Sequence, residues 1–259
     1  MKKTNCPPVL IDLDGVLRLG KSAAPGLGEF LKFLERNSIK AAIISNTTQS
    51  SAKSLRKFFD EKGVQLNLPM LTAADATAGY IKTRFKKAAV FAMPEILELF
   101  EDVLDIQNPE VVVMGDLGKE WSFEKLNAIF KFAHNNVPIV AMQKNKFWKT
   151  PEDGLLLDLG AFVKAIEYAA DVESLLIGKP SPLYFEQGLN VMGVAKGEEF
   201  IMIGDDLTND IYPVSELNGK GILIYTGKTS YPLPADTKRL PDFEAMNLIE
   251  AIEILKTYL

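Results

Sequence analysis

Short apolar runs that end in polar residues alternate with stretches of helical periodicity along the chain. The first run, residues 9–11, leads into Asp12, and the second, residues 41–44, stops at Ser45. Short apolar runs of this kind are typical of buried strands in a parallel sheet. Further runs cover residues 88–91, 111–114, 138–142, 175–177, 200–203 and 222–225. Their alternation with helical stretches predicts an α/β fold.

Apolar positions at helical spacing fill the intervals between these runs. The first predicted helix covers residues 27–35, and residues 18–24 before it are expected to form a loop. Thr72 is suited to cap a later helix, and Asp75 would lie in its first turn. Further helices are expected at residues 51–62, 123–134 and 161–170. Right-handed strand–helix–strand connections lay successive strands parallel, so their polar ends meet at one edge of the sheet.

Composition limits the classes of function that fit the chain. Its 259 residues allow one large domain or two modest ones, and 47% hydrophobic with 24% charged residues is ordinary for a soluble globular protein. The net charge of -5 shows no basic excess, which argues against nucleic-acid binding. No apolar run is long enough to span a membrane, and residues 1–8 lack the apolar core of a signal peptide. Because the one cysteine, Cys6, cannot form an internal disulfide, we expect a cytoplasmic protein.

Several catalytic classes lack the residues they need. The single histidine, His134, falls in the last turn of a predicted helix, where a structural role is favoured. The chain therefore has little material for a Ser-His-Asp triad or a histidine-rich zinc site. The phosphate-binding patterns GxGxxG and GxxxxGK followed by Ser or Thr do not occur.

Four predicted strand ends carry polar side chains. They supply carboxylates, a hydroxyl, an amide and one ammonium group: Asp12 and Asp14, Ser45 and Asn46, Lys179, and Asp205, Asp206 and Asp210. Carboxylate oxygens are ligands that Mg²⁺ favours, commonly together with oxygens of a substrate phosphate. A lysine and short polar donors suit a phosphate. If the strands are parallel neighbours, the four ends form one site at the edge of the sheet.

Each of these signals has a plain structural explanation when it is taken alone. The first two acids could be solvated members of an Asp-Gly turn, Ser45 could cap a helix, and Lys179 could be a surface charge. Residues 205–210 could form a solvated turn. A calcium loop does not fit, because its required Gly and Glu positions fall on Leu17 and Ala23. The joint occurrence at successive strand ends favours a functional site.

The order of these motifs resembles that of the haloacid dehalogenase-like phosphatases. The matching residues are Asp12-x-Asp14-Gly15-Val16, Ser45-Asn46, Lys179-Pro180 and Gly204-Asp205-Asp206-x-x-x-Asp210. The resemblance implies a Rossmann-like parallel-sheet core, residues 1–72 and 173–259, with an inserted α/β cap domain, residues 73–172. This long insert is similar to the large cap of the nucleotide-phosphatase-like subgroup. The stretches at residues 115–121, 144–148 and 153–155 narrow the resemblance to fewer members of this subgroup.

The resemblance implies a reaction carried out by two acids. Asp12 would attack phosphorus and form an aspartyl-phosphate. Asp14 would protonate the leaving oxygen and later take a proton from the hydrolytic water. A leaving halide needs no acid, whereas a phosphoester oxygen benefits from one, so Asp14 favours phosphoryl transfer to water over dehalogenation. A phosphomutase, which shares both acids, stays open.

The resemblance also implies a metal site and a phosphate site. Mg²⁺ would be held by the Asp12 carboxylate, the Asp14 backbone carbonyl and Asp205. The phosphoryl oxygens would be held by Ser45, the Asn46 backbone and Lys179. Asp206 or Asp210 would orient the waters of the metal or Lys179, and the sequence does not decide between the two.

The substrate is expected to be selected by the cap. Lys144 and Lys146 could meet a second anionic group, and Phe147 or Trp148 could line a pocket. An equally supported alternative is a solvated hairpin, turning at residues 152–154, whose aromatic side chains pack inside the cap. Phosphate monoesters, pyrophosphate and phosphoamidates all fit the motifs, as does a low-turnover phosphate-ligand-binding or scaffold protein. Oligomerisation through the cap is left open, and neither a nucleic-acid nor a membrane partner is expected.

Overall fold

The structure is a computed structural model and describes residues 6–150 and 153–259. Contacts within the chain divide it into two compact units. The first unit contains Met1–Ser45, Ser54–Leu71 and Pro180–Leu259, and the second contains Asn46–Lys53 and Thr72–Lys179. The second unit includes Asn46–Lys53 and continues to Lys179, whereas the expected cap covers residues 73–172. The expected domain bounds stay a prediction.

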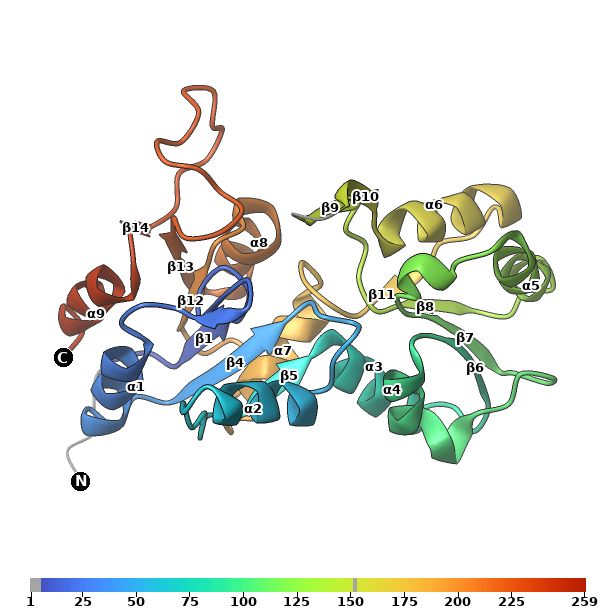
Figure 1. The fold of residues 1–259 in the computed structure, drawn as a ribbon, viewed down its shortest axis with the longest axis horizontal. Helices are drawn as coiled ribbons and strands as arrows, with labels where there is room; N and C mark the ends of the chain where they lie inside the picture. The colour runs from blue at the N-terminus through green and yellow to red at the C-terminus, as the bar shows by residue number, and fades with distance from the viewer. Residues whose placement is uncertain (1–5, 151–152) are drawn as a thin grey trace. The chain divides into compact units, whose positions relative to one another are not determined.

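A six-stranded sheet forms the centre of the first unit, in the order β14-β13-β12-β1-β4-β5 (Figure 1). Its strands are β1 (Val9–Asp12), β4 (Ala41–Ser45), β5 (Met70–Thr72), β12 (Phe200–Gly204), β13 (Gly219–Ile224) and β14 (Phe243–Ala245). β1 pairs in parallel with both β4 and β12. The strand order therefore reverses beside β1, and ligands of such sheets bind outside the carboxyl ends of the strands at this reversal. The predicted parallel-sheet α/β core is confirmed.

Helices pack on both faces of this sheet, because most residues of its strands are apolar and buried. They are α1 (Leu27–Arg36), α2 (Ala52–Glu61), α7 (Pro182–Asn190), α8 (Tyr212–Val214) and α9 (Leu248–Lys256). Side chains alternate between the two faces along β1. Val9 and Ile11 share one buried cluster with Phe30 of α1, whereas Leu10 faces α7. A Cβ on Gly188 of α7 would lie 3.1 Å from Leu10, so the missing side chain lets the helix pack closely.

The second unit is built on a four-stranded parallel sheet in the order β11-β8-β7-β6. Its strands are β6 (Ala88–Phe91), β7 (Val111–Met114), β8 (Ile139–Ala141) and β11 (Leu175–Leu176). Its helices are α3 (Ala73–Lys82), α4 (Pro94–Leu97), α5 (Phe123–His134) and α6 (Leu159–Ala170). A separate antiparallel pair is formed by β9 (Phe147–Thr150) and β10 (Gly154–Leu157). Within the described part of the chain, no helix has the length and apolarity needed to cross a membrane.

Several helix starts follow from side-chain caps in the sequence. Thr72 accepts a hydrogen bond from the backbone N–H of Asp75 at the start of α3, which confirms the predicted start. Ser122 caps α5, and this helix ends at His134, as expected. α6 begins two residues earlier than expected because Asp158 accepts a hydrogen bond from the backbone N–H that follows it.

Short elements complete the structure and correct one expectation. Residues 18–24 were expected to form a loop, but β2 (Arg18–Leu19) and β3 (Ser22–Ala23) pair as an antiparallel hairpin. Two paired residues per strand give no periodicity that a sequence could reveal. The predicted turn at residues 152–154 includes Glu152, which lies outside the described residues. The remaining short helices are η1 (Glu98–Val103), η2 (Gly118–Glu120), η3 (Leu207–Ile211, a π-helix) and η4 (Ser215–Leu217).

Candidate functional site

Three buried carboxylates meet at the carboxyl ends of β1 and β12 in the first unit. Asp12 is 6% exposed, Asp205 is 2% exposed and Asp210 is fully buried. Each offers an oxygen, and these oxygens all lie within 4.8 Å of one another. Three negative charges held this close in a buried place repel each other unless a cation or proton compensates them. The donor set therefore fits a hard divalent cation, which takes carboxylate oxygens.

Asp205 lies in a cradle formed by two loops of the first unit. The backbone N–H of Lys228 donates to Asp205 Oδ2 over 2.6 Å. A Cβ on Gly15 or on Gly227 would overlap the Asp205 carboxylate. Gly15 also has a φ of +88°, a conformation that side chains disfavour. Thr226 Oγ1 donates to the Gly15 carbonyl and so ties the two loops together. The glycines thus let both loops reach one carboxylate.

Asp206 and Asp210, which the sequence could not tell apart, have different surroundings. Asp206 accepts hydrogen bonds from the backbone N–H groups of Thr208 and Asn209, and it forms an ion pair of 2.9 Å with Lys228. Burial opposes the charge of Asp206, but Lys228 and Asn209 outweigh it and hold the pKa of Asp206 below its ordinary value. Asp210 instead belongs to the three-carboxylate group. The structure therefore gives Asp206 a capping and pairing position.

Asp14 lies outside the three-carboxylate group and is exposed. Its Oδ1 accepts a hydrogen bond of 2.7 Å from Arg18 Nε, so the two side chains form an ion pair. The Arg18 guanidinium also lies over the ring of Phe58, 5.5 Å from its centre. An exposed carboxylate that follows the end of β1 can exchange protons with solvent.

The remaining motif residues fall on either side of the boundary between the units. Ser45, 1% exposed, ends β4 in the first unit. Asn46 and Lys179 belong to the second unit, where they hold each other: Asn46 Nδ2 donates to the Lys179 carbonyl over 2.8 Å, and the Lys179 N–H donates to Asn46 Oδ1 over 2.7 Å. A Cβ on Gly178 would lie 2.7 Å from Asn46 Oδ1. Two motifs far apart in sequence thus meet through backbone–side-chain hydrogen bonds.

Predicted site residues also bond to described residues outside the motifs, among them Arg18, Tyr184 and Lys228. Arg18 follows Asp14 by four residues, a spacing that a search for ion pairs could have found. Lys228 follows the predicted strand at residues 222–225, so the same strand-end rule could have found it. Tyr184 looks in sequence like an ordinary apolar position of a helix, and nothing local reveals its contact with Ser45.

The cap residues proposed from the sequence divide into two groups. Lys144 Nζ forms an ion pair of 2.6 Å with Glu167 and donates to the Ser174 carbonyl. Lys146 is exposed, and Phe147 and Trp148 are 60% and 40% exposed. The two aromatic side chains are therefore exposed, whereas one alternative from the sequence packed them inside the cap.

The charge of Glu167 is compensated from several sides. Its carboxylate accepts from Lys144, Lys164 and the Ser174 N–H and hydroxyl. Burial alone would raise the pKa of Glu167, but these donors lower it from 4.5 to about 2. A depressed pKa means that the ionised group stabilises the folded chain above about pH 4.5 and that this contribution is lost as the pH falls towards 2.

Glu167→Gln is expected to lower the midpoint of thermal unfolding by roughly 5 °C at neutral pH. The difference from wild type should shrink as the pH falls from about 4.5 towards 2, because the unfolded chain takes up a proton first and protonation of Glu167 in the folded chain then removes the same interaction. Thermal unfolding followed by circular dichroism across this pH range measures it. Glu120→Gln, at the exposed pair with Lys125 (3.9 Å), is the matched control and should change little. A pH-independent difference would contradict the assignment.

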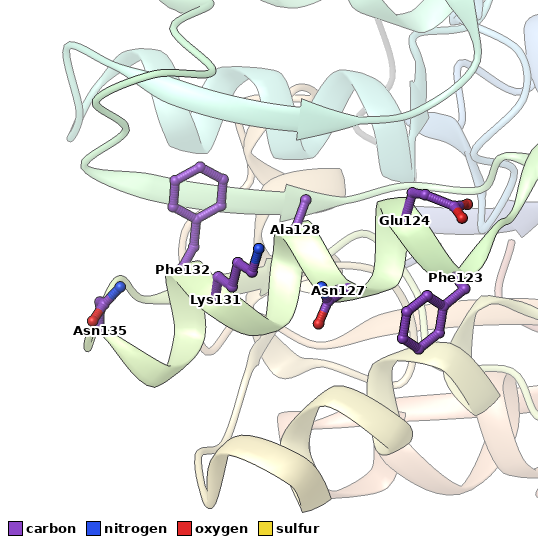
Figure 2. A pocket seen from close by; sticks show the side chains of 7 residues that line it. All are labelled: Phe123, Glu124, Asn127, Ala128, Lys131, Phe132 and Asn135. Atoms are coloured by element: carbon purple, nitrogen blue, oxygen red, sulfur yellow. The ribbon is translucent and has the colours of Figure 1, made fainter.

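The hollow in Figure 2 lies along α5 in the second unit. Its lining residues are Phe123, Glu124, Asn127, Ala128, Lys131, Phe132 and Asn135. Figure 2 shows Phe123 near one end of the helix and Asn135 near the other, so the hollow follows the helix surface. None of the predicted site residues lines it, and it does not bear on their roles.

A parallel sheet with acids grouped at the carboxyl ends of its central strands is typical of α/β enzymes. Comparison with known proteins identifies the family. Family models described as haloacid dehalogenase-like hydrolase match residues 9–104 and 122–213. A related model of the same superfamily matches residues 176–251. The chain belongs to the haloacid dehalogenase-like hydrolase family.

Two curated relatives are similar over most of the chain. The phospholysine phosphohistidine inorganic pyrophosphate phosphatase of Mus musculus is 30% identical over 96% of this chain and 94% of its own length. The haloacid dehalogenase-like hydrolase domain-containing protein 2 of Mus musculus is 32% identical over 85% of this chain and 84% of its own length. This chain is therefore a hydrolase, and the relative whose name states an activity is a phosphatase.

Solved structures agree with this assignment. The 4-nitrophenylphosphatase of Thermotoga maritima has a TM-score of 0.88 and 26% sequence identity, covering 96% of this chain and 97% of that chain. The p-nitrophenyl phosphatase of Archaeoglobus fulgidus has a TM-score of 0.88 at 20% identity and so supports the fold alone. The expected parallel-sheet α/β core with a cap domain is the fold of this family.

Proposed function

We propose that this protein is a Mg²⁺-dependent phosphatase that hydrolyses a small phosphorylated substrate through an aspartyl-phosphate. The observation that carries the proposal is the buried group of Asp12, Asp205 and Asp210 at the strand ends beside Ser45. Its accumulated negative charge fits a divalent cation, and the hydroxyl fits a phosphate oxygen. The phosphatase names of the relatives support the same reaction class.

In this proposal Asp12 is the nucleophile. One of its carboxylate oxygens forms a bond to phosphorus while the bond between phosphorus and the leaving oxygen breaks. Asp14 gives a proton to that oxygen and then takes one from the water that attacks the aspartyl-phosphate, which releases phosphate and restores Asp12. The Arg18 ion pair orients the Asp14 carboxylate before the substrate binds.

The metal would be held by the Asp12 and Asp205 carboxylates and by the Asp14 backbone carbonyl. When bound, Mg²⁺ would offset the repulsion between an anionic nucleophile and an anionic phosphate. We assign the supporting role to Asp210, because its carboxylate lies with the other two, and a structural role to Asp206. Ser45, the Asn46 backbone and Lys179 are proposed to bind the phosphoryl oxygens.

Substrate choice is proposed to come from the exposed residues Lys146, Phe147 and Trp148 of the cap. Lys144, which is held by Glu167, would position this segment and not contact the substrate.

We further propose that the protein acts in the cytoplasm. Burial raises the pKa of the Cys6 thiol to about 11, which keeps it protonated and unreactive. Association of two copies through the cap stays a prediction that gel filtration tests.

The proposal is tested by a phosphatase panel. The substrates are p-nitrophenyl phosphate, sugar phosphates, nucleotides, pyridoxal phosphate, pyrophosphate and phosphoamidates, assayed by phosphate release or by loss of the phosphoamidate. Turnover of at least one is expected to disappear with EDTA and to return with Mg²⁺. Lys146→Met should alter the ranking of substrates that carry a second anionic group and leave p-nitrophenyl phosphate unaffected. Tight phosphate binding without metal-dependent turnover of any substrate would instead favour the ligand-binding alternative.

A further inference from the structure

A fully buried tyrosine hydroxyl contacts the backbone at the end of β4. Tyr184, in the first turn of α7, is 0% exposed. Its hydroxyl oxygen lies 3.1 Å from the Ser45 nitrogen, which donates to it, and 2.7 Å from the Ser45 carbonyl oxygen. The Leu71 carbonyl oxygen is also 2.7 Å away. One side chain therefore reaches the backbone at two points of the chain that are separated by a helix.

The hydrogen count explains why a tyrosine is suited to this place. A phenol has one hydrogen to donate and lone pairs to accept with. It accepts from the Ser45 N–H and directs its single hydrogen to the Ser45 and Leu71 carbonyls, which lie at equal distances. A phenylalanine ring would fill the same apolar space but would remove this partner from buried backbone groups, which is costly.

The contact of Tyr184 with Ser45 lies where the pairing between β1 and β4 ends. The paired register of β1 and β4 ends with Asp12 opposite Ile44. Ser45 is the next residue, one position beyond this paired register. Tyr184 is a partner of the Ser45 backbone at this point. The Ser45 hydroxyl is attached to the backbone that Tyr184 holds, and the peptide that leads to the Asn46 N–H begins at the carbonyl it contacts.

We propose that Tyr184 is a positioning residue that fixes Ser45, and through it the Asn46 amide, for binding of the phosphoryl group. This inference rests on the proposed function, because it assigns the phosphoryl group to the Ser45–Asn46 pair. Even a small displacement of a group that binds the phosphoryl group causes a large loss of affinity and rate. Tyr184 touches neither the substrate nor the three carboxylates in this proposal, so it should leave metal binding unchanged.

Tyr184→Phe is the test, because it keeps the ring and removes only the hydroxyl. The inhibition constant of inorganic phosphate and the KM for p-nitrophenyl phosphate should each rise about tenfold. The Mg²⁺ concentration for half-maximal activity should not move. Thr77→Val, which removes a buried hydroxyl bonded to the Ala73 carbonyl over 2.7 Å, is the matched control and should leave all three values unchanged. Unfolding midpoints are measured first, and the assays run well below them.

A double-mutant cycle separates positioning from general stability. If Tyr184 acts through Ser45, Tyr184→Phe should weaken phosphate binding much less in the Ser45→Ala background than in wild type. Equal effects in the two backgrounds, or an unchanged phosphate constant in a folded Tyr184→Phe, would overturn the inference while the phosphatase assignment stands. Calorimetric titration with phosphate keeps the two distinct. A wild type that binds phosphate but turns nothing over would overturn only the proposed function.

Discussion

Asp12→Asn is expected to reduce phosphate release by at least about 1000-fold, because an amide of the same shape cannot attack phosphorus. The same change should stabilise the metal-free protein, with an unfolding midpoint in EDTA raised by roughly 3 °C. The reason is that Asp12 is one of three buried carboxylates whose oxygens lie within 4.8 Å of one another. Removing one charge relieves their repulsion. Hydrolysis of p-nitrophenyl phosphate and thermal unfolding measure the two effects.

Both effects of Asp12→Asn are tested against a matched control. Asp60→Asn makes the same chemical change at an exposed site of α2 and should alter neither quantity. Loss of activity combined with a lower midpoint in EDTA would mean that the aspartate is held by compensating protein charges and that the cation assignment is wrong. Equal activity in Asp12→Asn and wild type would remove the proposed nucleophile altogether.

The acids at the strand ends could be predicted from the sequence, because burial of the strands determines where the first charged residues stand. Buried strands of a parallel sheet are apolar throughout, so the first charges after a run, such as Asp12 and Asp205, mark the edge where the strands end. The pairing of Ile11 with Ile203 then brings these two ends together. The sequence therefore predicted the two strand ends, and the structure supplies the pairing that brings them together.

The division of roles between Asp206 and Asp210 was not predictable. It depends on the π-helix that follows β12, in which Asp206 caps the turn and Asp210 returns to the strand ends. The π-helix also makes a tertiary contact, the ion pair between Asp206 and Lys228. The contact of Tyr184 with Ser45 was hidden for a similar reason. It joins residues 139 positions apart, and neither neighbourhood carries a signal of it.

The excursion of Asn46–Lys53 into the second unit also left no trace in the pattern of apolar positions. The segment is short and polar, and it lies between a strand and a helix that both read as part of the core. Its place follows from single hydrogen bonds, such as that from Gln49 Nε2 to Asp116 Oδ2 (2.5 Å). The pattern of apolar positions predicts strands and helices, whereas single hydrogen bonds decide where a short polar segment lies.

Gly227→Ala should be nearly as damaging as loss of a ligand, although residue 227 carries no functional group. Its Cβ would overlap Asp205 Oδ2 and lie 2.8 Å from the backbone Cα of Gly15, so a shift of one side chain cannot make room. The Asp205 carboxylate would have to leave the Lys228 N–H that holds it. We expect the Mg²⁺ concentration for half-maximal activity to rise about 10- to 100-fold, as for other losses of support around a metal ligand. Maximal turnover should fall about 100-fold.

Titration of activity with Mg²⁺, and of the protein with Mn²⁺ by calorimetry, measures both parts of this prediction. Gly28→Ala in α1 is the matched control, because a Cβ there meets nothing within 4 Å and a helix favours alanine. It should leave metal binding unchanged and raise the unfolding midpoint slightly. If Gly227→Ala bound metal normally and lost only turnover, Asp205 would not be a metal ligand, and the loop at Thr226–Lys228 would act on the substrate instead. A weakened metal site with intact phosphate binding would place the loop, as proposed, on the metal side of the reaction.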